Sequence, residues 1–203
     1  VCSSSQKKAK LAKRLIIACY RWISYHNRAH YIFENHDDQI LFQKNRVLER
    51  ASSIVILGAG VDTKIYKPSK KYKNSEISFI FFGRLLYSKG LGEFLKAGEN
   101  LYKKGFQFKI LVCGLEDEVS PDAISRGDIK RWSEMPFVDW RGPVKHIQLI
   151  LQEANVAVLP TRYGEGVPRS LIEAASCGLA LIASDVPGCR EVVRPERNGI
   201  LVT

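Results

Sequence analysis

The chain has 203 residues, 45% of them hydrophobic, and a formal net charge of +10 at pH 7, so it is long enough to bury one α/β core with part of a second. No run of about 18 apolar residues occurs, and basic residues break up the apolar stretch near the N-terminus, which argues against a membrane span and a signal peptide. The five cysteines form no C-x-x-C pair, so we expect reduced thiols in a cytoplasmic protein.

The first 33 residues contain seven Lys or Arg residues and no Asp or Glu. Apolar side chains recur there at helical spacing, which predicts a basic amphipathic helix. Two interpretations stay open: the apolar stripe packs on a neighbouring sheet, or the helix makes peripheral contact with an anionic membrane, where each Lys or Arg contributes about 1 kcal/mol. Nucleic-acid binding is not favoured, because no nucleic-acid module accompanies the charge. The stripe consists of Leu11, Leu15, Ala18, Cys19, Trp22 and Ile23.

Strands and helices alternate along the rest of the chain. Short strands are predicted at 30–34 and 53–57 around a helix at 37–45. From residue 77 onward, short connections between strands and helices predict a parallel, doubly wound sheet that is covered on both faces. We expect the strands at 77–82, 106–112, 137–138, 156–159, 179–182 and 199–202, and the helices at 91–104, 122–132, 144–152 and 167–177.

Two turns of this predicted sheet carry polar groups. A ligand of a doubly wound sheet sits beyond the carboxyl ends of its strands. Gly83-Arg84 and Gly164-Glu165 both follow predicted strands, so we expect both to face one crevice. Glu165 and Glu173 lie eight residues apart across the start of the helix at 167–177. The N-terminus of that helix offers N–H groups and a partial positive charge to an anion.

Four ordered motifs resemble those of the retaining GT-B glycosyltransferases of glycosyltransferase family 4 (group 1), in the lipopolysaccharide and capsule-type subgroup. They match the interdomain hinge, the phosphate loop, the E-x7-E segment and the closing strand of the family's donor-binding domain. In order, they are Gly58-Ala-Gly-Val-Asp62 with Tyr66-Lys-Pro68, Gly83-Arg-Leu-Leu86 with Ser88-Lys-Gly90, Glu165 to Glu173, and Ser184 to Glu191 with Asn198-Gly-Ile-Leu-Val202.

The resemblance implies an α/β, Rossmann-like fold, namely the C-terminal domain of a GT-B enzyme with a remnant of the N-terminal domain. Residues 1–60 would be the end of the acceptor-binding domain with the hinge. Residues 61–203 would be the nucleotide-sugar donor-binding domain, truncated before its closing helices. We therefore expect this chain alone to be inactive in transfer.

The resemblance also implies a catalytic set. Arg84 and Lys89 would hold the donor diphosphate, with Gly83 letting the backbone approach, and Glu165 would bind hydroxyls of the donor sugar. An arginine fork and a compact ammonium both suit phosphate oxygens, and fixed cations stabilise a leaving group whose negative charge grows.

The remaining binding residues come from the same comparison. Glu173 would accept the ribose hydroxyls, and backbone N–H groups of Gly166 and Val167 would contact sugar or phosphate. Arg141 follows Trp140 in a loop expected near the base. We expect no metal and no further cofactor, because no D-x-D motif occurs, and Asp37-Asp38 is interpreted as a helix cap.

The implied function is retaining transfer of a hexosyl or N-acetylhexosaminyl group from a nucleotide-sugar, UDP being the first choice. The acceptor would be a glycan or a polyprenyl-diphosphate-linked glycan, at the inner face of the cytoplasmic membrane. Two alternatives stay open: a non-catalytic nucleotide-sugar-binding fragment, and a family 4 synthase that acts on a soluble acceptor.

Overall fold

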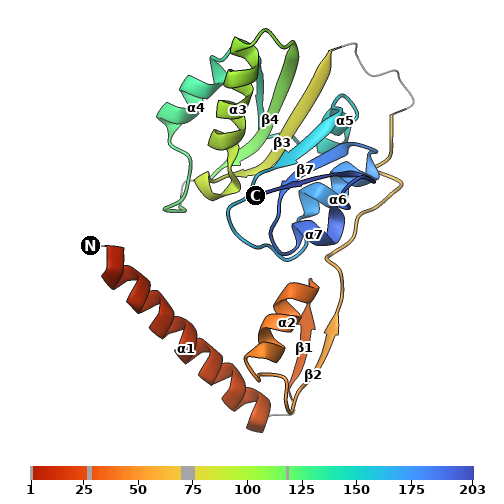
Figure 1. The fold of residues 1–203 in the computed structure, drawn as a ribbon. Coiled ribbons are helices and arrows are strands. Elements are labelled where there is room, and N and C mark those ends of the chain that lie inside the picture. The colour runs from red at the N-terminus through yellow and green to blue at the C-terminus, as the bar shows by residue number, and fades with distance from the viewer. Residues whose placement is uncertain (1, 27–28, 70–75, 118) are drawn as a thin grey trace. The chain divides into compact units, whose positions relative to one another are not determined.

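The computed structural model in Figure 1 describes residues 2–26, 29–69, 76–117 and 119–203. The chain divides into two compact units, Val1–Gly58 and Ala59–Thr203. This division falls two residues before the boundary expected between residues 60 and 61.

The first unit contains helix α1 (Cys2–His26), strand β1 (His30–Phe33), helix α2 (His36–Lys44) and strand β2 (Ser52–Val55). β1 and β2 pair in parallel. Aromatic rings join α1 and α2 to β1, since Phe42 contacts Tyr20, Tyr31 and Phe33 with ring centroids 5.0–5.6 Å apart. The amphipathic helix and the strand–helix–strand pattern predicted for this region are confirmed.

Asn35 caps α2, so the interpretation of Asp37-Asp38 as the cap was wrong by two residues. The Asn35 side chain accepts a hydrogen bond from the Asp38 backbone N–H at 2.8 Å and donates one to the Asp38 carboxylate. Asn is a good N-cap because its carbonyl oxygen satisfies an N–H that the helix leaves unpaired. The two aspartates lie in the first turn, where they complement the helix dipole.

The apolar stripe of α1 is exposed. Leu11, Leu15 and Trp22 keep 59%, 60% and 62% of their accessible surface, and no sheet within the described residues covers them. Ser24, on another side of the helix, is buried, and its hydroxyl donates to the Tyr20 carbonyl oxygen. No helix among the described residues combines the length and the apolar character that crossing a membrane requires.

The second unit is built on a six-stranded parallel sheet with the order β5-β4-β3-β6-β7-β8. The chain starts in the middle of the sheet at β3, builds one half outward to β5, then returns to β6 beside β3 and builds the other half. This is the doubly wound order of Rossmann-like folds, so the predicted fold class is confirmed. The strands are β3 (Ile77–Leu85), β4 (Phe108–Glu116), β5 (Val138–Gly142), β6 (Val156–Leu159), β7 (Ala180–Ser184) and β8 (Gly199–Val202).

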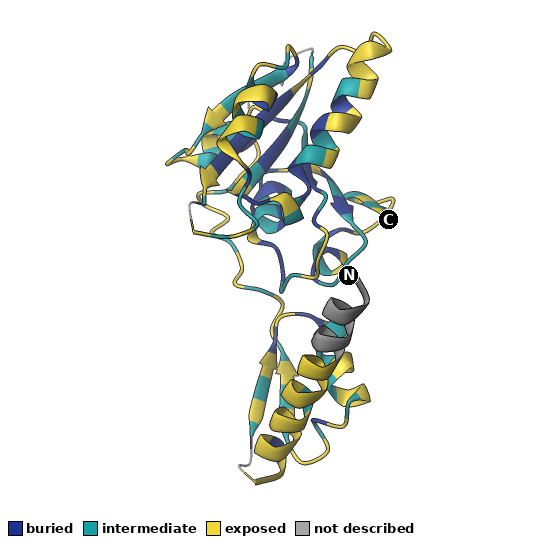
Figure 2. Cartoon of the chain, turned by 90° about the vertical axis from the view of Figure 1, so that its left-hand side faces the viewer, coloured by how far each residue is buried: buried dark blue, intermediate teal, exposed yellow. Residues whose placement is uncertain are grey.

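Helices cover both faces of this sheet, and the burial pattern in Figure 2 follows from that arrangement. Neighbouring strand residues point to opposite faces, so Ile80 packs in one core cluster and Phe81 in the other. The described helical segments of this unit are η1 (Tyr87–Lys89), α3 (Leu91–Lys103), α4 (Arg126–Ser133), α5 (Ile147–Leu151), α6 (Arg169–Ser176) and α7 (Cys189–Val192).

Four strands, β3, β4, β5 and β7, run further than their apolar runs predict. Gly83 and Arg84, expected in a loop, lie within β3 because their backbones pair with Gly114 and Leu115 of β4. Arg141, also expected in a loop, lies within β5. Backbone pairing continues past the last apolar side chain because ladder hydrogen bonds do not depend on side-chain polarity.

Several helices start later than predicted. α4 begins after Ser125, whose hydroxyl accepts a hydrogen bond from the Asp128 backbone N–H, and α6 begins after Pro168, which is its N-cap. The short helix α7 had no predicted counterpart.

Candidate functional site

The candidate site lies where the strand order reverses, at the carboxyl ends of β3 and β6. The segments that follow these strands contact each other, since the Arg162 backbone N–H donates to the Ser88 carbonyl oxygen at 2.8 Å. Gly90 allows this approach: its φ is +78°, and a Cβ there would lie 2.0 Å from the Pro160 carbonyl oxygen. Ligands of open α/β sheets bind at such a switch point.

Lys89 and Glu165 form an ion pair across this switch point. Lys89, at the end of η1, donates from Nζ to Glu165 Oε2 at 2.7 Å, and the two side chains are only 16% and 15% exposed. The ammonium also lies 5.3 Å from the centre of the Tyr163 ring. The two residues predicted separately for phosphate and sugar therefore contact each other directly in this structure.

A pocket of about 460 Å³ opens beside the carboxyl ends of β3 and β4. Gly83, Arg84 and Glu173, which were predicted from two distant motifs, all line it. The Gly83 backbone has φ +143°, and no atom lies within 4 Å of a Cβ built on it. A ligand can therefore approach this backbone closely.

Glu173 is held in place from two sides. It is buried, and its Oε1 accepts a hydrogen bond from Arg169 NH2 at 3.1 Å, one helical turn earlier. Tyr66 lies next to it, and the pKa of the Tyr66 hydroxyl is raised by burial, by the charge of Glu173 and by the hydrogen bond it donates to that carboxylate. A carboxylate has about four acceptor positions, so capacity remains for ligand hydroxyls.

Arg84 is exposed at the mouth of this pocket and is paired with Asp117 at 3.5 Å. Hydrogen bonds from the backbone N–H groups of Ser120 and Val119, and then the charge of Arg84, lower the pKa of the Asp117 carboxyl, while partial burial opposes them. An exposed ion pair of this kind contributes little to stability, so a phosphate can replace the carboxylate at small cost.

Other predicted residues lie elsewhere. Arg141 is outside the lining of this pocket: it binds Asp139 Oδ1 at 2.8 Å and lies 3.6 Å from Glu153, and the hydrogen bond with Asp139 raises the pKa of its guanidinium. Gly166 and Val167 lie between Glu165 and the start of α6, and Val167 is buried.

Among the lining residues that were not predicted from the sequence are Arg169, Tyr66 and Cys113. Arg169 could have been found, because it precedes Glu173 by four residues and such pairs meet on a helix. Nothing in the sequence distinguishes Cys113 from the apolar strand residues around it. Burial raises the pKa of its thiol to about 11, so the thiol stays neutral. Within the described ranges, no three His, Cys, Asp or Glu side chains gather as metal ligands would.

The model for the family "Glycosyl transferases group 1" matches residues 76–203. The chain belongs to this family. The match contains β3, the Lys89–Glu165 pair and the helix with Glu173, so it covers three of the four motifs and confirms the membership in glycosyltransferase group 1 that they indicated.

One similar protein is the N,N'-diacetylbacillosaminyl-diphospho-undecaprenol alpha-1,3-N-acetylgalactosaminyltransferase of Campylobacter jejuni. It is 29% identical over 205 aligned residues, which include 95% of this chain and 52% of that protein. This chain thus spans about half the length of that relative.

Two solved structures show the same fold. A glycosyltransferase from Rickettsia africae superposes with a TM-score of 0.75 at 15% identity, over 91% of this chain and 52% of that one. Anabaena Alr3699/HepE in complex with UDP superposes with a TM-score of 0.70 at 22% identity, over 85% of this chain and 49% of that one. The chain therefore folds like about half of a GT-B glycosyltransferase.

Proposed function

We propose that this chain is the donor-binding half of a glycosyltransferase that transfers a sugar from a nucleotide-sugar to a glycan or a lipid-linked glycan in the synthesis of cell-surface polysaccharide. One observation carries the proposal: Gly83, Arg84, Arg169 and Glu173 line a single pocket at the carboxyl edge of the sheet. A nucleoside diphosphate requires cations that bind its phosphates, here the arginines, and a fixed carboxylate that accepts its ribose hydroxyls, here Glu173.

UDP is the nucleotide we propose, because it is bound in Alr3699/HepE, whose fold this chain shares. Arg84 and Lys89 would neutralise the diphosphate without a metal, and Glu165 would orient the donor sugar. Retention of the anomeric configuration and a polyprenyl-diphosphate-linked acceptor at the inner membrane face complete the proposal. The lipid-linked acceptor is supported by the similarity to the Campylobacter jejuni enzyme, which is named for a diphospho-undecaprenol-linked acceptor.

Calorimetric titration of UDP, GDP and ADP into this chain tests the donor site. Arg84→Ala is expected to weaken the preferred nucleotide by about 1 to 3 kcal/mol, because a charge-assisted hydrogen bond to phosphate is lost. Arg131→Ala is the matched control: Arg131 is 67% exposed against 62% for Arg84, and it is also paired with an aspartate. Equal affinities in the two variants would reject the diphosphate site.

A second titration tests the role of Glu173. The unchanged chain is expected to bind UDP about tenfold more tightly than 2′-deoxy-UDP, and Glu173→Ala is expected to bind both alike, because the carboxylate that accepts the 2′-hydroxyl is gone. Glu99→Ala is the control, since Glu99 also pairs with a cation four residues away on a helix. Discrimination that persists in Glu173→Ala would assign ribose recognition to another residue.

The alternative of a non-catalytic nucleotide-sugar-binding fragment is tested on the 203 residues as they stand. Glycosyl transfer by this chain, lost in Glu165→Ala, would reject that alternative. A family 4 synthase with a soluble acceptor would transfer to a free sugar at an undiminished rate without a lipid-linked acceptor.

A further inference from the structure

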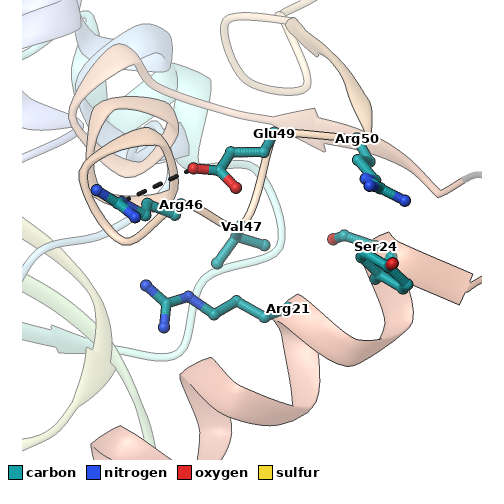
Figure 3. A pocket seen from close by; sticks show the side chains of 7 residues that line it. Arg21, Ser24, Arg46, Val47, Glu49 and Arg50 are labelled. Atoms are coloured by element: carbon teal, nitrogen blue, oxygen red, sulfur yellow. Dashed lines mark ion pairs between the residues drawn. The ribbon is translucent and has the colours of Figure 1, made fainter.

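A second pocket, of about 340 Å³, opens in the first unit between α1 and the segment that joins α2 to β2. Arg21 on α1, Arg46 just after α2 and Arg50 just before β2 line it, and we call it the arginine pocket. In Figure 3 the guanidinium groups of Arg21 and Arg46 extend to the same side of Val47, which is itself 2% exposed.

The three guanidinium groups are held by different contacts. Arg21 Nε donates to the Asn45 carbonyl oxygen at 2.7 Å, which uses one of its five N–H donors. Arg50 lies 4.0 Å from the centre of the Tyr25 ring, a cation–π contact that leaves the edge of the guanidinium plane available to acceptors. Arg46 is 3.7 Å from Glu49, and both side chains are strongly exposed, so this ion pair is weak.

The pocket therefore has a net positive charge. Its lining contains three arginines and one carboxylate, that of Glu49, which gives a formal charge of +2. An anion entering here would meet several fixed donors and little repulsion.

The arginine pocket differs in position from the usual ligand crevice of this fold. β1 and β2 run parallel and begin at His30 and Ser52. The other lining residues come shortly before these starts, so they lie at the amino edge of the two strands; they are Ser24, Tyr25, Arg46, Val47, Glu49 and Arg50. Substrates of open α/β sheets bind at the opposite, carboxyl edge.

We propose that the arginine pocket binds a phosphate group, as a site separate from the donor pocket. A tetrahedral phosphate can accept hydrogen bonds from several directions, whereas a planar carboxylate is saturated by fewer guanidinium forks. Three arginines from two segments line this pocket, and such a set of donors fits a phosphate better.

The phosphate can come from a soluble phosphate ester or from an anionic lipid headgroup. Exposed Leu15 and Trp22 lie on α1 about 100–120° around the helix axis from Arg21, so hydrocarbon contacts are available near the pocket. Both sources present a phosphate group to the arginines, but only the lipid headgroup requires a bilayer.

The first measurement titrates inorganic pyrophosphate into the chain carrying Arg84→Ala, so that the donor pocket contributes little. The arginine Nε–Hε resonances are followed by NMR, which reports each guanidinium separately. Adding Arg21→Ala or Arg50→Ala is expected to weaken binding about tenfold, the loss of one charge-assisted hydrogen bond. Arg14→Ala is the control, because it removes the same charge from the same helix outside the pocket; its change should stay under about twofold.

The second measurement sediments the chain with vesicles of phosphatidylcholine, with and without phosphatidic acid. A loss of vesicle binding in Arg21→Ala and Arg50→Ala, greater than in Arg14→Ala, would support the site and identify the lipid headgroup as the source. Weaker pyrophosphate binding alone would support the site with a soluble ligand. If pocket variants and Arg14→Ala behave alike in both measurements, or if pyrophosphate leaves the Arg21 and Arg50 resonances unmoved, the site is overturned.

Arg50→Lys keeps the charge but loses the planar guanidinium fork. It keeps the test decisive even if an alanine variant fails to fold. Its pyrophosphate affinity is expected to lie between those of the unchanged chain and Arg50→Ala. UDP affinity should be unchanged in all these variants when Arg84 is intact, because none of the three arginines lines the donor pocket.

Discussion

Lys89→Ala is expected to lower the free energy of unfolding of this chain by about 3 kcal/mol and to weaken UDP binding. The Lys89 ammonium and the Glu165 carboxylate are 2.7 Å apart, and each side chain is about 15% exposed. Removing one partner of such a pair leaves the other charge poorly solvated, which typically costs about 3 to 5 kcal/mol in a buried site. We take the lower end because some solvent still reaches both groups. Urea unfolding followed by circular dichroism measures the change.

A double variant separates the electrostatic cost from the loss of packing. Lys89→Met with Glu165→Gln removes both charges and keeps most of the volume, so its stability is expected to return to within about 1 kcal/mol of the unchanged chain. UDP binding should stay weak, because the proposed phosphate ligand is still missing. A cost below about 0.5 kcal/mol for Lys89→Ala would show that the pair behaves like an exposed surface ion pair.

The sequence predicted the layout of the second unit because its strands are long apolar runs bounded by turns. Ile80 and Phe81 fill opposite faces of the sheet, and such runs are typical of strands buried on both sides. The approach of Glu173 to Gly83 and Arg84 in one pocket also followed, since carboxyl ends of parallel strands meet at one edge.

What the sequence did not predict depends on tertiary contacts. β3 extends through Gly83 and Arg84 because β4 pairs with it there. Arg141 forms ion pairs with Asp139 on its own strand and with Glu153 on another segment. The direct Lys89–Glu165 contact joins residues 76 positions apart, and neither motif indicates it alone. The arginine pocket was missed because its members belong to two segments whose charges appear, along the chain, as ordinary surface charge.

Gly188→Ala is expected to cost about 3 kcal/mol or more and to displace Glu165. Gly188 has φ +82°, and a Cβ on it would lie 1.8 Å from the Gly166 carbonyl oxygen and 2.5 Å from that of Glu165. Both are backbone atoms, so no side-chain rotation can relieve the overlap; the segment that carries Glu165 must shift. A shift of that size breaks the 2.7 Å contact with Lys89, so UDP or donor-sugar affinity should fall together with stability.

Gly105→Ala is the control for the positive φ at Gly188. Gly105 has a similar φ of +87°, but no atom lies within 4 Å of a Cβ built there. Both variants place alanine at a positive φ, which costs roughly 1 to 2 kcal/mol in the left-handed region. The excess cost of Gly188→Ala therefore combines the contact between the 185–188 turn and the Glu165 segment with the added strain of a ψ of −46° at Gly188. Equal melting temperatures for the two variants would mean that the backbone adjusts to the added Cβ at little energetic cost. Glu165 would then be held in place by Lys89 and not by the packing of the two turns.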